Sequence, residues 1–335
     1  MREKVSYWLI WVFVLSGFLL GIGLFSLWVG PKRIPFSTLI SLIFERRIST
    51  ESSILFDIRL PRIILGFAIG GSLSLAGVIL QGMFRNPLVE PYTLGISGGA
   101  GLGVSLNIVL RVHQRVGVLS LPLSGFLGAL SVVFFLYFLS ARRGVLKIHN
   151  LLLYGVMISF ISSSLIMLIM AVSRVEDLHG IIFWMMGSLE EPNGFLIRLT
   201  FILSIVGLVL SYLFSISLNA LSVGEEEAFH LGVDVEKTKR FLFLVATLLT
   251  GISVSVAGMI GFVGLVVPHF VRIFIGRDHR ILLLGSFLCG SSFLILCDTL
   301  ARTVIAPSEL PVGVITGILG GSLFIYALGK RNMVL

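Results

Sequence analysis

The chain has 335 residues, of which 56% are hydrophobic and 13% are charged. Soluble domains have roughly 45–50% apolar and about 25% charged residues, so the polar residues here are too few to cover a water-soluble globule. The formal net charge is +8, but basic residues beside membrane spans are expected for orientation alone. No basic run with interleaved aromatics occurs, which excludes nucleic-acid binding. The apolar runs are long and continuous, unlike the short alternating strands of an outer-membrane barrel. The composition therefore predicts an all-α polytopic membrane protein.

Ten transmembrane helices are predicted, because each crossing needs about 20 predominantly apolar residues. In chain order they cover 6–29, 63–84, 93–110, 117–139, 151–172, 195–217, 240–258, 262–275, 281–300 and 312–328. The nearly uncharged run 241–275 is too long for one crossing and is divided where Gly258, Gly261, Gly264 and Pro268 interrupt it. The ten spans form a single transmembrane domain, residues 1–335.

Loop charge predicts the orientation, since Lys and Arg are more frequent in cytoplasmic loops. An even number of spans places both termini on one side, and that side carries more Lys and Arg than the other. We therefore expect both termini to be cytoplasmic. The basic residues predicted to lie outside are concentrated between the first two spans, and the role of residues 30–58 stays open.

An internal repeat is visible at a constant offset along the chain. The residues Gly70, Ser72, Ser74, Ala76, Gly77, Ile79 and Pro87 reappear as Gly251, Ser253, Ser255, Ala257, Gly258, Ile260 and Pro268. Five spans separate the copies, so the copies, spans 2–5 and 7–10, would cross the membrane in opposite directions. Inverted repeats of this kind are frequent in transporters, with the pathway at the repeat interface.

The sequence contains no recognisable catalytic or nucleotide-binding motif. There is no GxxxxGK[ST] phosphate-binding loop, no HExxH and no GxSxG. The histidines lack metal-ligand spacing, and Cys289 and Cys297 are too far apart on one helix to form a disulfide. Asp298 is the acid set well inside a span, with Arg302 as its i,i+4 ion-pair partner. We therefore predict no catalytic residue, metal or bound cofactor, and an energy source in another chain.

The longest cytoplasmic connection, residues 218–240, predicts a short helix outside the bilayer. Ser222 and Glu225 have the spacing of a capping box, and Gly232 is a suitable helix terminator, so the helix is expected at about 222–232. Asp234 is expected to cap the next span. Three successive glutamates would be repelled by anionic headgroups, which favours a cytoplasmic protein partner over a lipid surface.

Five motifs, in order, resemble one family. They are RLPRIILGFAIGGSLSLAGVILQGMFRNPLVEPYTLGISGGAGLG (59–103), VGEEEAFHLGVDVEK, AGMIGFVGLVVPHFVRIFIGRDHR, DTLAR and ELPVGVITGILGG (309–321). The chain is similar to FecCD/BtuC-like permeases of iron-chelate and cobalamin importers, the type II ABC importers. The resemblance implies a homodimer in the cytoplasmic membrane of a bacterium or archaeon, two cytoplasmic ATPase subunits that bind ATP and Mg, and an extracytoplasmic solute-binding protein. It implies transport of a metal chelate (a ferric siderophore, haem or cobalamin) by alternating access. The alternative is an ion-coupled secondary transporter acting without an ATPase, for which the sequence lacks coupling carboxylates in its spans.

The resemblance also assigns residues to roles. ATPase coupling falls on Gly224, Glu225, Ala228, Leu231, Gly232, Arg85, Asn86 and Pro87. Docking of the binding protein falls on Arg59, Arg62 and Arg302, which match arginines that meet glutamates on the partner. The translocation pathway falls on two spans, Leu151 to Val172 and Val312 to Leu328.

Overall fold

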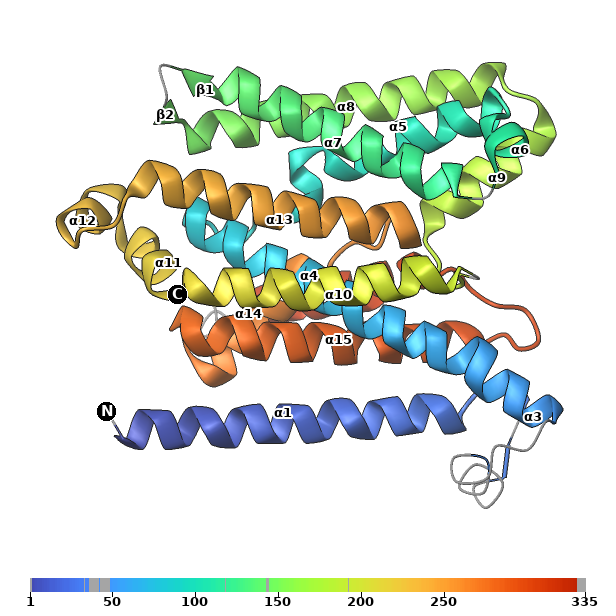
Figure 1. Ribbon diagram of the computed structural model, residues 1–335, viewed down its shortest axis with the longest axis horizontal. Coiled ribbons are helices and arrows are strands. Elements are labelled where there is room, and N and C mark those ends of the chain that lie inside the picture. The colour runs from blue at the N-terminus through green and yellow to red at the C-terminus, as the bar shows by residue number, and fades with distance from the viewer. Residues whose placement is uncertain are drawn as a thin grey trace.

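The computed structural model describes residues 2–32, 34–35, 42, 49–117, 119–142, 145–191 and 193–329. The described part is helical apart from one short antiparallel hairpin, in which β1 pairs with β2 (Figure 1). In chain order the elements are α1 (Arg2–Trp28), α3 (Thr50–Ser53), the π-helical η1 (Ile54–Arg59), α4 (Leu60–Phe84), the 3-10 turn η2 (Pro91–Leu94), α5 (Ile96–Val109), α6 (Val112–Val116), α7 (Ser120–Ser140), β1 (Ala141–Arg142), β2 (Val145–Leu146), α8 (Ile148–Val172), α9 (Val175–Met186), α10 (Gly194–Leu213), α11 (Ser215–Val223), α12 (Glu225–His230), α13 (Val235–Ala257), α14 (Val263–Ile275), α15 (His279–Thr303) and α16 (Val312–Gly329).

A helix occupies each of the ten predicted spans. Eight of the described helical segments are long and apolar enough to cross a membrane. The other two, α5 and α14, have 14 and 13 residues, which is less than one bilayer thickness. The all-α membrane fold is confirmed, whereas the exact number of crossings stays a prediction.

Several short helical segments were not predicted from the sequence. The 12-residue α9 follows α8, and its signals were acidic residues in its first turn, Glu176 and Asp177, and the terminating Gly187 at φ 76. The sixth predicted span divides into α10 and α11 at Phe214. Within the open region 30–58, α3 and η1 continue directly into α4, which makes one helical run from Thr50 to Phe84.

Glycine explains why α4 lies at the centre of the bundle. A Cβ at Gly70 would collide with the carbonyl of Gly290 in α15, and a Cβ at Gly290 would collide with that of Gly70. A Cβ at Gly77 would collide likewise with the carbonyl of Gly264 in α14. The backbones of α4, α14 and α15 therefore touch, as small residues permit in lipid. In the most apolar stretch of the helical run Thr50–Phe84, 83% of the residues are buried, against 11% in that of α1.

The repeat is only partly visible in the structure. Its first helices, α4 and α13, run in opposite directions, as an inverted repeat requires (Figure 1). The residue register does not persist, because Gly77 lies within α4 whereas Gly258 ends α13 at φ 70. Pro87 lies in a loop, whereas Pro268 lies inside α14. The aligned prolines therefore do not occupy equivalent positions, and the full repeat stays a prediction.

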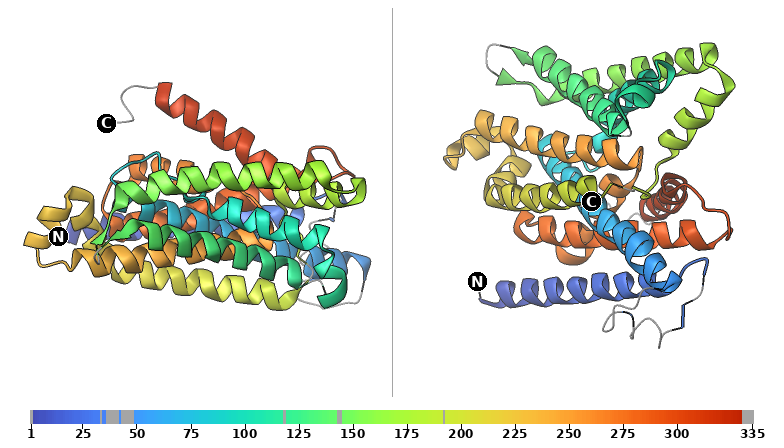
Figure 2. Two further views of the ribbon diagram at one scale, coloured as in Figure 1. Left: turned by 90° about the horizontal axis from the view of Figure 1, so that it is seen from above. Right: turned by 45° about the vertical axis from the view of Figure 1, so that its right-hand side comes forward.

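The bundle has two distinct ends. One end, which we call the α12 end, carries α12, the hairpin, the start of α1 and the end of α16 (Figure 1). The opposite end, which we call the α3 end, carries α3, α6 and the start of α10 (Figure 1). The described ends of the chain therefore lie at the same end of the bundle as α12. Helix α16 projects away from the other helices (Figure 2).

Candidate functional site

At the α12 end, the predicted cytoplasmic helix is present but begins later than expected. Ser222 lies inside α11 and donates to the carbonyl of Asn219, so it forms no capping box with Glu225. Gly224 precedes α12 instead, in an extended conformation. The predicted end is correct, because Gly232 has φ 81 and follows the C-cap Leu231. The Asp234 side chain accepts from the backbone N–H of Lys237 and caps α13, as predicted.

The residues assigned to ATPase coupling divide into exposed and buried groups. Leu231 and Gly232 are exposed. The side chain of Leu231 is 72% exposed, and that of Phe229, two residues earlier, is 70% exposed. Large apolar side chains so exposed at a loop end favour a protein contact. By contrast Ala228 and Gly224 are buried within the chain. Glu225 is half-buried and paired with Lys239, so its carboxylate is already engaged.

The segment Arg85–Pro87 lies at the same end. Arg85 ends α4 in a left-handed conformation at φ 50. The Asn86 carboxamide oxygen accepts from the backbone N–H of Leu88 at 2.9 Å, which forms the turn. Arg85 and Pro87 are exposed. Near the end of α4, a Cβ at Gly82 would be 3.0 Å from Leu218 of α11, so the two predicted coupling segments are joined through α11.

A second polar group at this end fixes the start of α15. The Asp278 carboxylate accepts from the backbone N–H and the guanidinium of Arg280 and from the amide of Asn219. The Arg280 hydrogen bonds lower the pKa of Asp278 to about 2. Asn219 belongs to α11, so this carboxylate holds α11 against α15. In the same way, the hydrogen bond from Lys237 lowers the pKa of Asp234.

The three arginines predicted to dock the binding protein do lie close together, but they are buried. Arg59, Arg62 and Arg302 are 1%, 5% and 2% exposed. Asp298 lies between two of them: its Oδ1 accepts from Arg62 at 3.0 Å, and its Oδ2 forms an ion pair with Nε of Arg302 at 2.9 Å. The pairing of Asp298 with Arg302 expected from the i,i+4 spacing is therefore confirmed.

The burial changes what these arginines do in this conformation. Arg62 also donates to Glu309 at 2.7 Å, and Arg59 donates to backbone carbonyls at the end of α1, among them that of Trp28 at 3.0 Å. Their hydrogen bonds are thus made within this chain, and a docking protein could reach them only if the α3 end repacked. The exposed fraction could not be read from the sequence, because it depends on α1 and α15 covering the start of α4.

The short half-helix α14, predicted as the span 262–275, follows a break in the chain that side chains of another segment stabilise. The carboxylate of Glu90 accepts from the backbone N–H of Phe262, just before α14, at 2.6 Å. The hydroxyl of Tyr92 accepts from the N–H of Ile260 at 2.7 Å. Unsatisfied backbone groups at membrane depth cost several kcal/mol each, so Glu90 and Tyr92 stabilise the interruption between α13 and α14. The signal in the sequence was the acid and the tyrosine in NPLVEPY.

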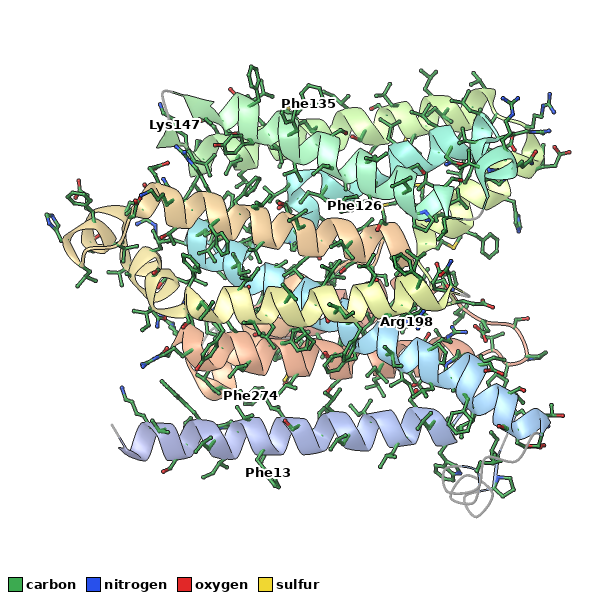
Figure 3. All side chains as sticks on the ribbon, viewed as in Figure 1. Phe13, Phe126, Phe135, Lys147, Arg198 and Phe274 are labelled. Carbon is green, nitrogen blue, oxygen red and sulfur yellow. The ribbon has the colours of Figure 1, made fainter. Side chains whose placement is uncertain are left out.

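The predicted pathway helices α8 and α16 are among the least buried of the apolar spans. In the most apolar stretches of α8 and α16, 17% and 22% of the residues are buried. On α8 the exposed side chains include Met157 and Phe160, and on α16 they include Ile318. Figure 3 shows side chains projecting outward along the outer helices. A Cβ added at Gly317 would have no described atom within 4 Å, so this face of α16 is open to a partner.

Among the described residues, no group of three or more His, Cys, Asp or Glu side chains is placed to hold a metal ion. Cys289 and Cys297 are free thiols, and Cys297 is buried in the core. The predicted absence of a disulfide between them is therefore confirmed.

The helical bundle, its half-helix and the short helix projecting at one end define a polytopic transport permease. The chain belongs to the FecCD transport family, whose model matches residues 18–330. It is 40% identical over 278 residues to the hemin transport system permease protein HmuU of Yersinia pestis, covering 82% of this chain and 83% of that one. It is 38% identical to the cobalamin import system permease protein BtuC of Halobacterium salinarum, covering 85% and 75%. A solved structure described as an inward-facing conformation of a metal-chelate type ABC transporter superimposes with a TM-score of 0.83 at 30% identity, covering 96% of this chain and 99% of that one.

Proposed function

We propose that this chain is the membrane-spanning subunit of an ATP-driven importer for a metal chelate. Two copies would form the pathway between their α8 and α16 helices, and each copy would bind one ATPase subunit through α12. A solute-binding protein would deliver the chelate at the α3 end. ATP and Mg would be bound by the ATPase, so this chain would perform no bond chemistry. The membrane would be the cytoplasmic membrane, with the α12 end facing the cytoplasm.

The observation that carries this proposal is the surface of α12. Phe229 and Leu231 are exposed at the end of a helix that projects from the bundle (Figure 1). The residues of α12 and its flanks outline an open hollow of about 510 Å³, lined by Glu225, Glu226, Phe229, His230 and Val235. A partner helix or loop that filled this hollow would bury Phe229, which supports ATPase docking at this position.

The alternative of an ion-coupled transporter is not favoured. Such a protein needs membrane carboxylates that are free to bind the coupling ion. Asp298, the acid deep in α15, is engaged by Arg62 and Arg302. Uptake into proteoliposomes that contain only this chain, driven by a proton or sodium gradient, would overturn the proposal in favour of this alternative.

The direct test is assembly and transport with the cognate ATPase. Phe229→Asp should abolish co-purification of the ATPase and ATP-driven uptake, because it places a charge in the apolar contact. Val116→Asp is the matched control, since Val116 is equally exposed (70%) but lies in α6, at the α3 end. Haem, cobalamin and a ferric siderophore, each labelled, would be offered in turn. Unchanged ATPase co-purification with Phe229→Asp would contradict docking through α12.

A further inference from the structure

A buried lysine at the α12 end joins three elements at one atom. Lys239, in α13, is 1% exposed. Its ammonium donates to Glu225 of α12 at 2.9 Å and to the carbonyl of Leu146 in β2 at 3.0 Å, and it forms an ion pair with Glu236 of α13 at 2.6 Å. The second oxygen of Glu236 accepts from the backbone N–H of Leu146 at 2.8 Å.

These contacts satisfy the buried ammonium from three segments. A lysine ammonium can only donate, and here it has two hydrogen-bond acceptors, on α12 and β2, and a further carboxylate on α13 as an ion-pair partner. A buried charge is tolerated only where its partners are kept in place, because loss of one partner leaves an uncompensated ion. The three segments are therefore constrained to move together or to break a buried ionic contact.

The order of the elements along the chain shows that Lys239 connects α12 with the start of α8. Glu225 is the first residue of α12, the helix proposed to contact the ATPase, and Gly224 before it interrupts the helix from α11. Leu146 is the last residue of β2, and α8 begins two residues later at Ile148. A displacement of α12 is thus delivered through one side chain to the start of a proposed pathway helix, without passing through the rest of the bundle.

We infer that Lys239 is a positioning residue that transmits movement of α12 to α8 and so couples ATP binding to opening of the pathway. The inference rests on the proposed function, since it requires that α12 contacts the ATPase. A purely structural role would give a different pattern: loss of Lys239 would lower stability but leave any surviving complex fully coupled.

The experiment follows α8 directly in the complex of two permease subunits and two ATPase subunits in nanodiscs. A spin label is attached at Phe160→Cys, which is exposed on α8, in a background where Cys289 and Cys297 are alanine. The distance between the labels of the two copies is measured without nucleotide and after trapping with ATP and vanadate. ATP hydrolysis and co-purification of the ATPase are measured on the same samples.

The decisive variants are Lys239→Met and Glu225→Gln. Lys239→Met removes the ammonium, whereas Glu225→Gln releases α12 and leaves Lys239 paired with Glu236, so it tests the link even where Lys239→Met does not fold. The matched controls are Lys237→Met and Glu227→Gln, because Lys237 is 85% exposed and pairs with Asp234, and Glu227 is exposed on α12. Lys239→Arg keeps the charge and should restore most of the coupling.

In the complexes that retain the ATPase, we expect both decisive variants to hydrolyse ATP while the nucleotide-dependent shift in the equilibrium between the two label distances falls about fivefold or more, within the usual range of coupling factors. The controls should behave as the wild type. A full distance change in Glu225→Gln would overturn the role of Lys239, as would an equal loss in Glu227→Gln, which would indicate a general charge effect. If the wild type itself neither binds the ATPase nor changes distance with nucleotide, it is the proposed function that fails.

Discussion

Gln81 supplies the hydrogen bond that Pro268 removes. Pro268 lies inside α14 and has no N–H to donate to the carbonyl of Gly264, four residues earlier. The amide of Gln81, in α4, donates to that carbonyl at 3.2 Å. The carboxamide oxygen of Gln81 accepts in turn from Arg272 of α14 at 3.1 Å. One side chain of α4 therefore bonds to both the interrupted turn and the last turn of the half-helix.

The first prediction follows from this replacement. Gln81→Leu should lower the free energy of unfolding by about 1–3 kcal/mol, because it leaves a buried carbonyl and a guanidinium without partners. In a Pro268→Ala background the cost should be smaller, since the restored N–H can satisfy Gly264. The wild type, the two single variants and the double variant form a double-mutant cycle, and the unfolding of each purified protein in mixed micelles gives its free energy. Strictly additive costs would contradict the relationship.

A second prediction concerns the close approach of α4 and α14. Gly77→Ala should destabilise the protein by about 1–3 kcal/mol, the usual range for overpacking, because its Cβ would collide with the carbonyl of Gly264. Gly17→Ala in α1 is the matched control, since a Cβ there has no atom within 4 Å. Thermal melting of both variants in detergent gives the comparison. Equal melting temperatures would show that α14 moves aside at little cost.

A third prediction separates a structural role from a docking role for the buried arginines. Asp298→Asn should cost about 3–5 kcal/mol, because it leaves Arg62 and Arg302 buried without a full counter-charge. Glu51→Gln should cost much less, because the Lys32–Glu51 pair is far more exposed and screened by solvent. Arg302→Glu should likewise reduce stability. If Arg302→Glu were instead fully stable and only slowed association of the binding protein, the docking role would be restored.

The fourth prediction is a pH dependence at the α12 end. Because the pKa of Asp278 is lowered from 3.8 to about 2 in the folded protein, its stabilising effect is present above the unfolded pKa. The effect is lost as the pH falls from about 4 through 2. At pH 7, Asp278→Asn should therefore be less stable than the wild type by a few tenths to about 1 kcal/mol, because asparagine can still cap the helix but the ion pair with Arg280 is lost.

The measurement compares the melting temperatures of the wild type and Asp278→Asn from pH 7 down to pH 2. The difference should be constant above about pH 5 and should vanish toward pH 2. A difference that persisted at the lowest pH would mean that the ionised carboxylate is not what stabilises the start of α15.

The sequence determined the class and much of the local structure. Continuous apolar runs are sufficient to predict membrane helices, because a helix satisfies its own backbone in lipid whatever surrounds it. Local signals also located Gly232 after α12, Asp234 before α13 and the i,i+4 pair of Asp298 and Arg302. Ordered motifs identified the family. The capping box at Ser222 was predicted wrongly because α11 extends through that position.

Only the tertiary structure decided which charged side chains are exposed and which are joined. Arg59 and Arg62 resembled a surface pair in the sequence, yet α1 and α15 cover them. Lys239 resembled Lys237, two residues away on the same helix, but Glu225 and Leu146 approach it from segments 14 and 93 residues away. Burial and ionic partners are set by contacts between distant segments, and no local pattern encodes which segments will meet.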